Sequence, residues 1–135
     1  MSDDPARHPV TELTLVIPPA NDHIRFARLM ASAVAARLGY DFDTLENLRI
    51  AVSELCTAVT EGAVSRELTL TYRGDVEGLR ITGYAPAVPG SPAPREPEEL
   101  TRQILDAVAD EHSFDIGPSG INFTLLLRAT LPLAP

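Results

Sequence analysis

The chain has 135 residues, and its hydrophobic fraction of 44% and charged fraction of 22% are ordinary for a soluble globular protein. Acidic residues outnumber basic ones by 19 to 11, and the resulting net charge of -8 argues against nucleic-acid binding, which needs a basic surface. The sequence contains no lysine, which excludes Schiff-base chemistry and a phosphate-binding lysine of the Walker type. It shows neither a recognisable signal peptide nor an apolar run of membrane-spanning length, so we expect a cytoplasmic protein with no membrane partner.

The N-terminal part of the chain is predicted to contain a tail and a first strand. Residues 1–10 are polar and include two prolines, which indicates a disordered tail, and we expect residues 11–135 to form a single domain. Apolar and polar side chains alternate over Thr11–Ile17, a pattern typical of a strand.

A first helix is predicted to follow this strand. Asn21 or Asp22 can cap its N-terminus, and its apolar stripe continues to about Leu38. Gly39 then provides a residue that readily adopts the left-handed conformation in which many helices end.

The second helix has the clearest start in the sequence, because Asp43 and Glu46 have the spacing of a capping box. Gly62 is the predicted end. An apolar ridge recurs at steps of three and four residues and consists of Leu45, Leu48, Val52, Leu55 and Val59. Glu54 lies about 130° around the helix from this ridge, so it can face away from a sheet that the ridge covers. Cys56 falls among aliphatic residues and is interpreted as a packed thiol.

The second half of the chain is predicted to add four strands and one helix. The segments are hairpin strands at 67–73 and 79–84, a proline-rich loop at 85–97, a helix from about 97 to 110, a short strand near Phe114 and a last strand at 120–131. The order β-α-α-β-β-α-β-β favours a two-layer α+β sandwich, in which three helices cover one face of a mixed, mostly antiparallel sheet.

The sequence LRIAVSELCTAV, at residues 48–59, has the arrangement of a nucleotide-site helix that lacks one residue. Glu54 and Ala58 are four residues apart and therefore share one helix face. A kinase or ATPase built on such a helix needs a carboxylate to take a proton and an amide oxygen to help hold Mg²⁺. Glu54 could supply the first, whereas Ala58 has no side-chain oxygen. Without further context, Glu54 is most simply a solvated acid on the outer face of the helix.

The element order and the text LENLRIAVSELCTAVTEGA resemble the RsbW-type anti-sigma-factor serine kinases of the GHKL (histidine-kinase-like) ATPase superfamily. In that family the second helix carries the motif (Ser/Asp)-Glu-x-x-x-Asn. Ser53 and Glu54 match its start, and Ala58 stands at the asparagine position. The resemblance covers about residues 13–131 and implies the histidine-kinase-like ATPase (Bergerat) fold.

Two further signatures of that family are degenerate in this chain. In the motif Asp-x-Gly-x-Gly, whose aspartate contacts the adenine amino group, Gly83 replaces the aspartate. Ala85 and Ala87 replace the two glycines of that motif. Glu99 and Thr101 stand at glycines of the turn that holds the triphosphate before the last helix. The acidic side chains at this helix start, Glu96, Glu98 and Glu99, would repel phosphate oxygens. We therefore expect no bound nucleotide and no metal site.

The resemblance implies a homodimer that sequesters an alternative sigma factor, for which an anti-sigma-factor antagonist competes. In the family, the face around the first helix and the loop before the last helix make such contacts. These features point to Arg25, Arg28 and Met30 and to the loop at 85–97.

Three hypotheses for function follow from these residues. The leading hypothesis is a pseudokinase that works by binding protein. The alternative is an active serine/threonine protein kinase that binds ATP and Mg²⁺, in which Glu54 takes the proton from a serine of the antagonist. The third is a binding module that uses the same fold for another purpose.

Overall fold

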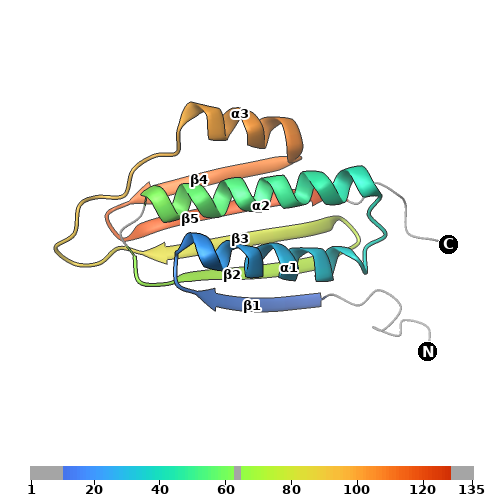
Figure 1. Ribbon diagram of the computed structural model, residues 1–135, viewed down its shortest axis with the longest axis horizontal. Helices are drawn as coiled ribbons and strands as arrows, with labels where there is room; N and C mark the ends of the chain where they lie inside the picture. The colour runs from blue at the N-terminus through green and yellow to red at the C-terminus, as the bar shows by residue number, and fades with distance from the viewer. Residues whose placement is uncertain (1–10, 63–64, 129–135) are drawn as a thin grey trace.

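The computed structural model describes residues 11–62 and 65–128, in which helices pack on one face of a five-stranded sheet (Figure 1). The strands are β1 (Thr11–Ile17), β2 (Leu68–Asp75), β3 (Gly78–Pro86), β4 (Glu111–Gly117) and β5 (Gly120–Arg128). The helices are the 3-10 helix η2 (Asn21–His23) and the α-helices α1 (Ile24–Ala35), α2 (Phe42–Gly62) and α3 (Glu99–Val108). The predicted tail at residues 1–10 and the predicted end of the last strand lie outside the described residues. Within the described ranges, no helix combines the length and apolar character needed to cross a bilayer.

The sheet has the strand order β1-β2-β3-β5-β4, and every neighbouring pair is antiparallel. The predicted α+β sandwich with helices on one face is confirmed, but the sheet is not mixed. The chain runs from β3 through α3 to β4, a connection that makes these two strands parallel. Because β5 lies between them, the parallel strands are not neighbours.

The core lies between the sheet and α2, whose apolar ridge is buried as predicted. Leu48, Val52, Leu55 and Val59 are each at most 3% exposed, and Leu45 packs against them from the edge of the core. Cys56 is also buried, and desolvation raises its pKa to about 12. It is therefore a packed, protonated thiol, as predicted, and lacks the thiolate character of a nucleophile.

The helix starts differ from their predicted positions. The Oδ1 atom of Asp41 accepts a hydrogen bond from the backbone N–H of Thr44 at 2.8 Å, which also lowers the pKa of the carboxyl group. Asp41 is thus the N-cap of α2, and Asp43, predicted as the cap, lies within the first turn. The prediction for α1 was also wrong, because Asn21 and Asp22 belong to η2 and provide no side-chain cap.

Two buried tyrosines join the helix layer to the sheet. The Tyr40 hydroxyl accepts a hydrogen bond from the N–H of Leu79 at 2.8 Å and donates one to the carbonyl of Leu127. Burial raises the pKa of Tyr40 to about 12, so the hydroxyl keeps the proton that it donates. The Tyr72 hydroxyl donates to the carbonyl of Ala27 at 2.9 Å and so fixes α1 over β2. These bonds hold α1 and α2 at defined positions above the strands.

Candidate functional site

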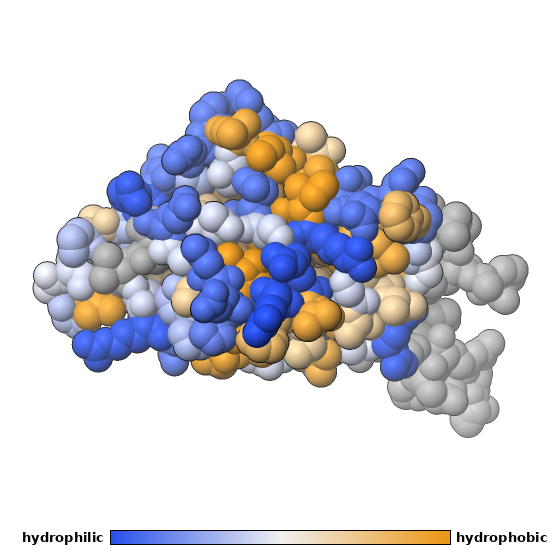
Figure 2. Space-filling model, in the orientation of Figure 1, coloured by the Kyte–Doolittle hydropathy of each residue, from blue (hydrophilic) through white to orange (hydrophobic). Residues whose placement is uncertain are grey.

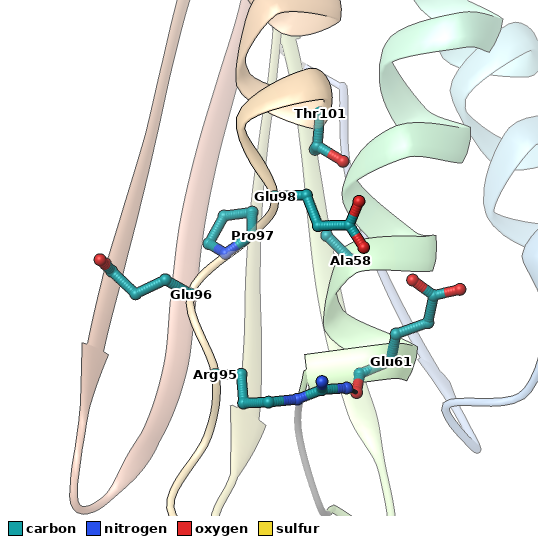
Figure 3. Close-up of a pocket in the computed structure, with 7 residues that line it drawn as sticks. All are labelled: Ala58, Glu61, Arg95, Glu96, Pro97, Glu98 and Thr101. Carbon is teal, nitrogen blue, oxygen red and sulfur yellow. Dashed lines mark hydrogen bonds between the residues drawn. The ribbon is translucent and has the colours of Figure 1, made fainter.

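The helix motif is placed on α2 as predicted, but its two key residues have different surroundings. Ala58 lines a cavity of about 80 Å³ between the end of α2 and the start of α3 (Figure 3). The other residues that line it are Glu61, Arg95, Glu96, Pro97, Glu98 and Thr101. Glu54 is partly buried one turn away, does not line this cavity, and has no hydrogen-bond or ion-pair partner among the described residues. The structure therefore does not bring the candidate base together with the cavity.

The position of the adenine-binding aspartate in the resembled family is covered by an aromatic ring. Gly83 on β3 pairs directly with Phe123 on β5, and both residues face the helices. A Cβ atom added to Gly83 would overlap three carbons of the Phe123 ring, of which the farthest, Cε1, lies at 2.9 Å. The ring is 2% exposed and packs beside Phe114, with the ring centroids 6.3 Å apart. A side chain at residue 83 and this ring thus exclude each other.

The remaining degenerate positions are divided among β3, the segment that follows it and α3, and Ala85, predicted in the loop at 85–97, belongs to β3 instead. Ala85 is fully buried in β3, and the N–H of Ala87 donates to the carbonyl of Ser119 at 2.8 Å. Helix α3 begins at Glu99, which is exposed, whereas Thr101 lines the cavity. The side chain of Glu98, the N-cap of α3, makes no capping hydrogen bond. The acids at this end complement the helix dipole and leave it with little attraction for a phosphate.

A second concave surface lies between α1 and α2 and includes two of the three predicted partner residues. This groove of about 330 Å³ is lined by Arg25, Arg28, Leu29, Ser32 and Arg49. We call it the arginine groove. Met30, the third predicted residue, does not line it and packs against the core instead.

The arginine groove combines positive charge with exposed apolar side chains. The Nη1 atom of Arg28 donates to Ser53 Oγ at 3.2 Å, and Arg25 lies over the ring of Phe26, 5.2 Å from its centroid. Leu29 is 64% exposed, and Arg49 forms an exposed ion pair with Glu46 at 2.6 Å. Figure 2 shows strongly hydrophilic and hydrophobic side chains next to each other over α1 and α2.

No family model matches the chain, but proteins named serine-protein kinase RsbW are similar to part of it. The serine-protein kinase RsbW of Bacillus velezensis is 40% identical over 58 residues, which are 43% of this chain and 36% of that protein. RsbW of Halalkalibacterium halodurans is 36% identical over 56 residues, with 42% and 35% covered, and RsbW of Bacillus subtilis is 36% identical over 55 residues, with 41% and 34% covered. The chain therefore matches about a third of the length of these relatives.

A crystal structure of the RsbU and RsbW domains of Rv1364c from Mycobacterium tuberculosis superposes with a TM-score of 0.68. The match has 15% sequence identity and covers 90% of this chain and 33% of that chain. The two chains therefore share a fold, which is consistent with the histidine-kinase-like ATPase fold that the resemblance implies. The sequence relatives confirm the resemblance to the RsbW-type anti-sigma-factor kinase family.

Proposed function

We propose that this protein is an anti-sigma-factor-like regulator that binds and sequesters an alternative sigma factor, an anti-sigma-factor antagonist, or both, without phosphoryl transfer. The observation that carries the proposal is the ring of Phe123 over Gly83, because it fills the place where the family's adenine contact would be made. The proposal includes a homodimer and a cytoplasmic location, as the family resemblance implies.

The geometry of the cavity at Ala58 supports a role without nucleotide. Pockets for small molecules and cofactors usually have volumes of about 300–1,000 Å³, whereas this cavity has about 80 Å³. Phosphoryl transfer depends on positioning and on neutralising the charge of the transferred group. Here Ala58 offers no ligand for Mg²⁺, and the acidic residues of the cavity lining, Glu61, Glu96 and Glu98, outnumber its one cationic residue, Arg95, where a phosphate would need positive charge.

The arginine groove is the surface that we propose for the protein partner. Its positive charge stands out in a chain with a net charge of -8 and fits an acidic segment of a partner. Leu29 and Phe26 add apolar area at its edge, and arginine and aromatic anchors dominate the energetics of many interfaces. A stable complex would need to bury about 1,200–2,000 Å² in total, so the groove would form only part of the interface.

The active-kinase alternative keeps some support, because the relatives are named serine-protein kinases and Glu54 is present without a partner among the described residues. In that function, ATP and Mg²⁺ would have to bind although Ala58, Gly83 and Ala87 lack the family's side chains or backbone freedom. Titration with nucleotide separates the two functions.

If the arginine groove binds the partner, reversing the charge of its arginines should weaken that binding. The tagged full chain should co-purify with an alternative sigma factor or its antagonist from the native host, as identified by mass spectrometry. The double variant Arg25→Glu/Arg28→Glu should weaken binding of the purified partner at least about 30-fold in calorimetry, since losing a buried charge contact typically costs 2–5 kcal/mol.

Arg37→Glu is the matched control, because Arg37 is exposed and lies outside the arginine groove. It should bind like the unmodified chain. If the double variant bound the partner as tightly as the unmodified chain does, the proposal that the arginine groove is the partner surface would be refuted. Partners that include neither a sigma factor nor an antagonist would favour the binding module with another purpose.

A further inference from the structure

The segment of residues 87–98, which joins β3 to α3, makes few hydrogen bonds with the other described residues. At its start the N–H of Ala87 donates to the carbonyl of Ser119, and Ser91 N–H donates to the carbonyl of Val88 at 3.0 Å within the segment. Gly90 has a φ of +83°, a conformation that glycine adopts without strain. The prolines of this segment, Pro89, Pro92, Pro94 and Pro97, limit its freedom further.

One side chain of this segment reaches α2. The Nη2 atom of Arg95 donates to the backbone carbonyl of Glu61 at 2.6 Å (Figure 3). Helix α2 ends at Gly62, so the carbonyl of Glu61 is one of the last four, which have no partner within the helix. A guanidinium at this end also interacts favourably with the helix dipole and forms a charge-assisted hydrogen bond.

The other contacts near Arg95 stay within the segment and α3. Glu96 forms an ion pair with Arg102 at 3.5 Å, and the N–H of Arg102 donates to the carbonyl of Glu98. Among the hydrogen bonds and ion pairs between described residues, only the bond from Arg95 joins residues 88–98 to α2. Arg95 also lines the cavity at Ala58, where its side chain runs from the segment to the end of α2 (Figure 3).

We infer that Arg95 is a positioning residue that holds residues 87–98 against the end of α2 without any ligand. Its cation satisfies a carbonyl of the protein itself, so the position of this segment does not depend on a bound nucleotide. If the proposed function is correct, the loop surface available to a protein partner is already formed in the free protein. The role of Arg95 in holding the segment does not depend on which partner binds.

Hydrogen exchange measured by mass spectrometry on the full chain tests this inference. In Arg95→Ala, the hydrogen-bonded amides of this segment, those of Ala87 and Ser91, should exchange about tenfold faster, as expected for the loss of a hydrogen bond to a charged group. Peptides from β2, β3 and β5 should keep their protection, and the melting temperature should stay nearly constant. Arg95→Lys keeps a positive donor and should restore part of the protection.

Arg37→Ala is the matched control, since Arg37 is an exposed arginine whose side chain makes no hydrogen bond or ion pair with the described residues. It should leave exchange of the segment unchanged. Unchanged exchange in Arg95→Ala would overturn the inference, and so would a slowing of exchange in the unmodified chain by millimolar ATP and Mg²⁺. Failure to recover a sigma factor or antagonist, with the exchange result intact, would count against the proposed function alone.

Discussion

Replacing Gly83 by aspartate, the residue that the family signature carries, should lower the free energy of unfolding by about 3 kcal/mol or more. The new Cβ would overlap the ring of Phe123, and overpacking of a core typically costs 1–3 kcal/mol. The carboxylate would in addition be buried beside aromatic rings with no cation on the neighbouring strand positions, which adds a desolvation cost. Urea denaturation followed by circular dichroism measures the loss.

Gly117→Ala is the control for this substitution, because a Cβ at Gly117 meets nothing within 4 Å. It should change stability by no more than about 0.5 kcal/mol. A Gly83→Asp protein with unchanged stability would show that the ring does not fill this position. The account would also be wrong if that variant gained affinity for adenine nucleotides.

Truncation of Phe123 to alanine is expected to cost about 3–5 kcal/mol, the usual range for a buried phenylalanine. The ring is 2% exposed and packs between the inner faces of β3 and β4, where Gly83 and Phe114 contact it. Thermal unfolding or urea denaturation gives the value. We expect no nucleotide binding in this variant, because removing the ring restores neither a magnesium ligand at Ala58 nor an adenine acceptor at Gly83.

Phe42→Ala provides the comparison, since this ring is 72% exposed and its loss should cost little. A double-mutant cycle makes the test specific to the contact between strands. Gly83→Ala should be destabilising alone but nearly neutral in the background of Phe123→Ala, because the overlapping ring is then absent. Additive costs would contradict the direct opposition of the two side chains.

Local patterns in the sequence predicted most of the fold. The apolar ridge of α2 predicted which helix face is buried, because this periodicity follows directly from helix geometry. The alternation in β1 predicted the strand but not its burial, since Ile17 is buried whereas Leu13 on the same face is 39% exposed. The residues that cap the helices were harder to predict. Asp41 and Asp43 both precede the ridge, and only the backbone conformation decides which carboxylate reaches the N–H of Thr44.

The candidate site depended more on contacts between distant segments. The sequence showed that Gly83 cannot contact adenine, but it could not show that Phe123 covers the same place. That contact depends on the register between β3 and β5, which places Gly83 opposite Phe123, a residue forty positions later in the chain (123 − 83). The only available signal was a glycine on one inner strand face and a large aromatic residue on another. Likewise, Arg49 joins Arg25 and Arg28 only because α1 packs beside α2.

The contact made by Arg95 could not be predicted from the sequence, for a different reason. It lies in a proline-rich segment without periodicity, and its partner is a backbone carbonyl, which has no signature in the sequence. The free carbonyls at the end of a helix can be foreseen as a class. Which side chain satisfies them follows from the path of the loop in three dimensions.

Calorimetric titration of the full chain with ATP and Mg²⁺, combined with thermal unfolding in the same buffer, tests the central claim most directly. We predict no saturable heat at millimolar nucleotide and no change in the melting temperature. Saturable binding with a matching rise in stability, which would reach about 2.7 kcal/mol at a ligand concentration of 100 times Kd, would contradict the claim and favour an active kinase.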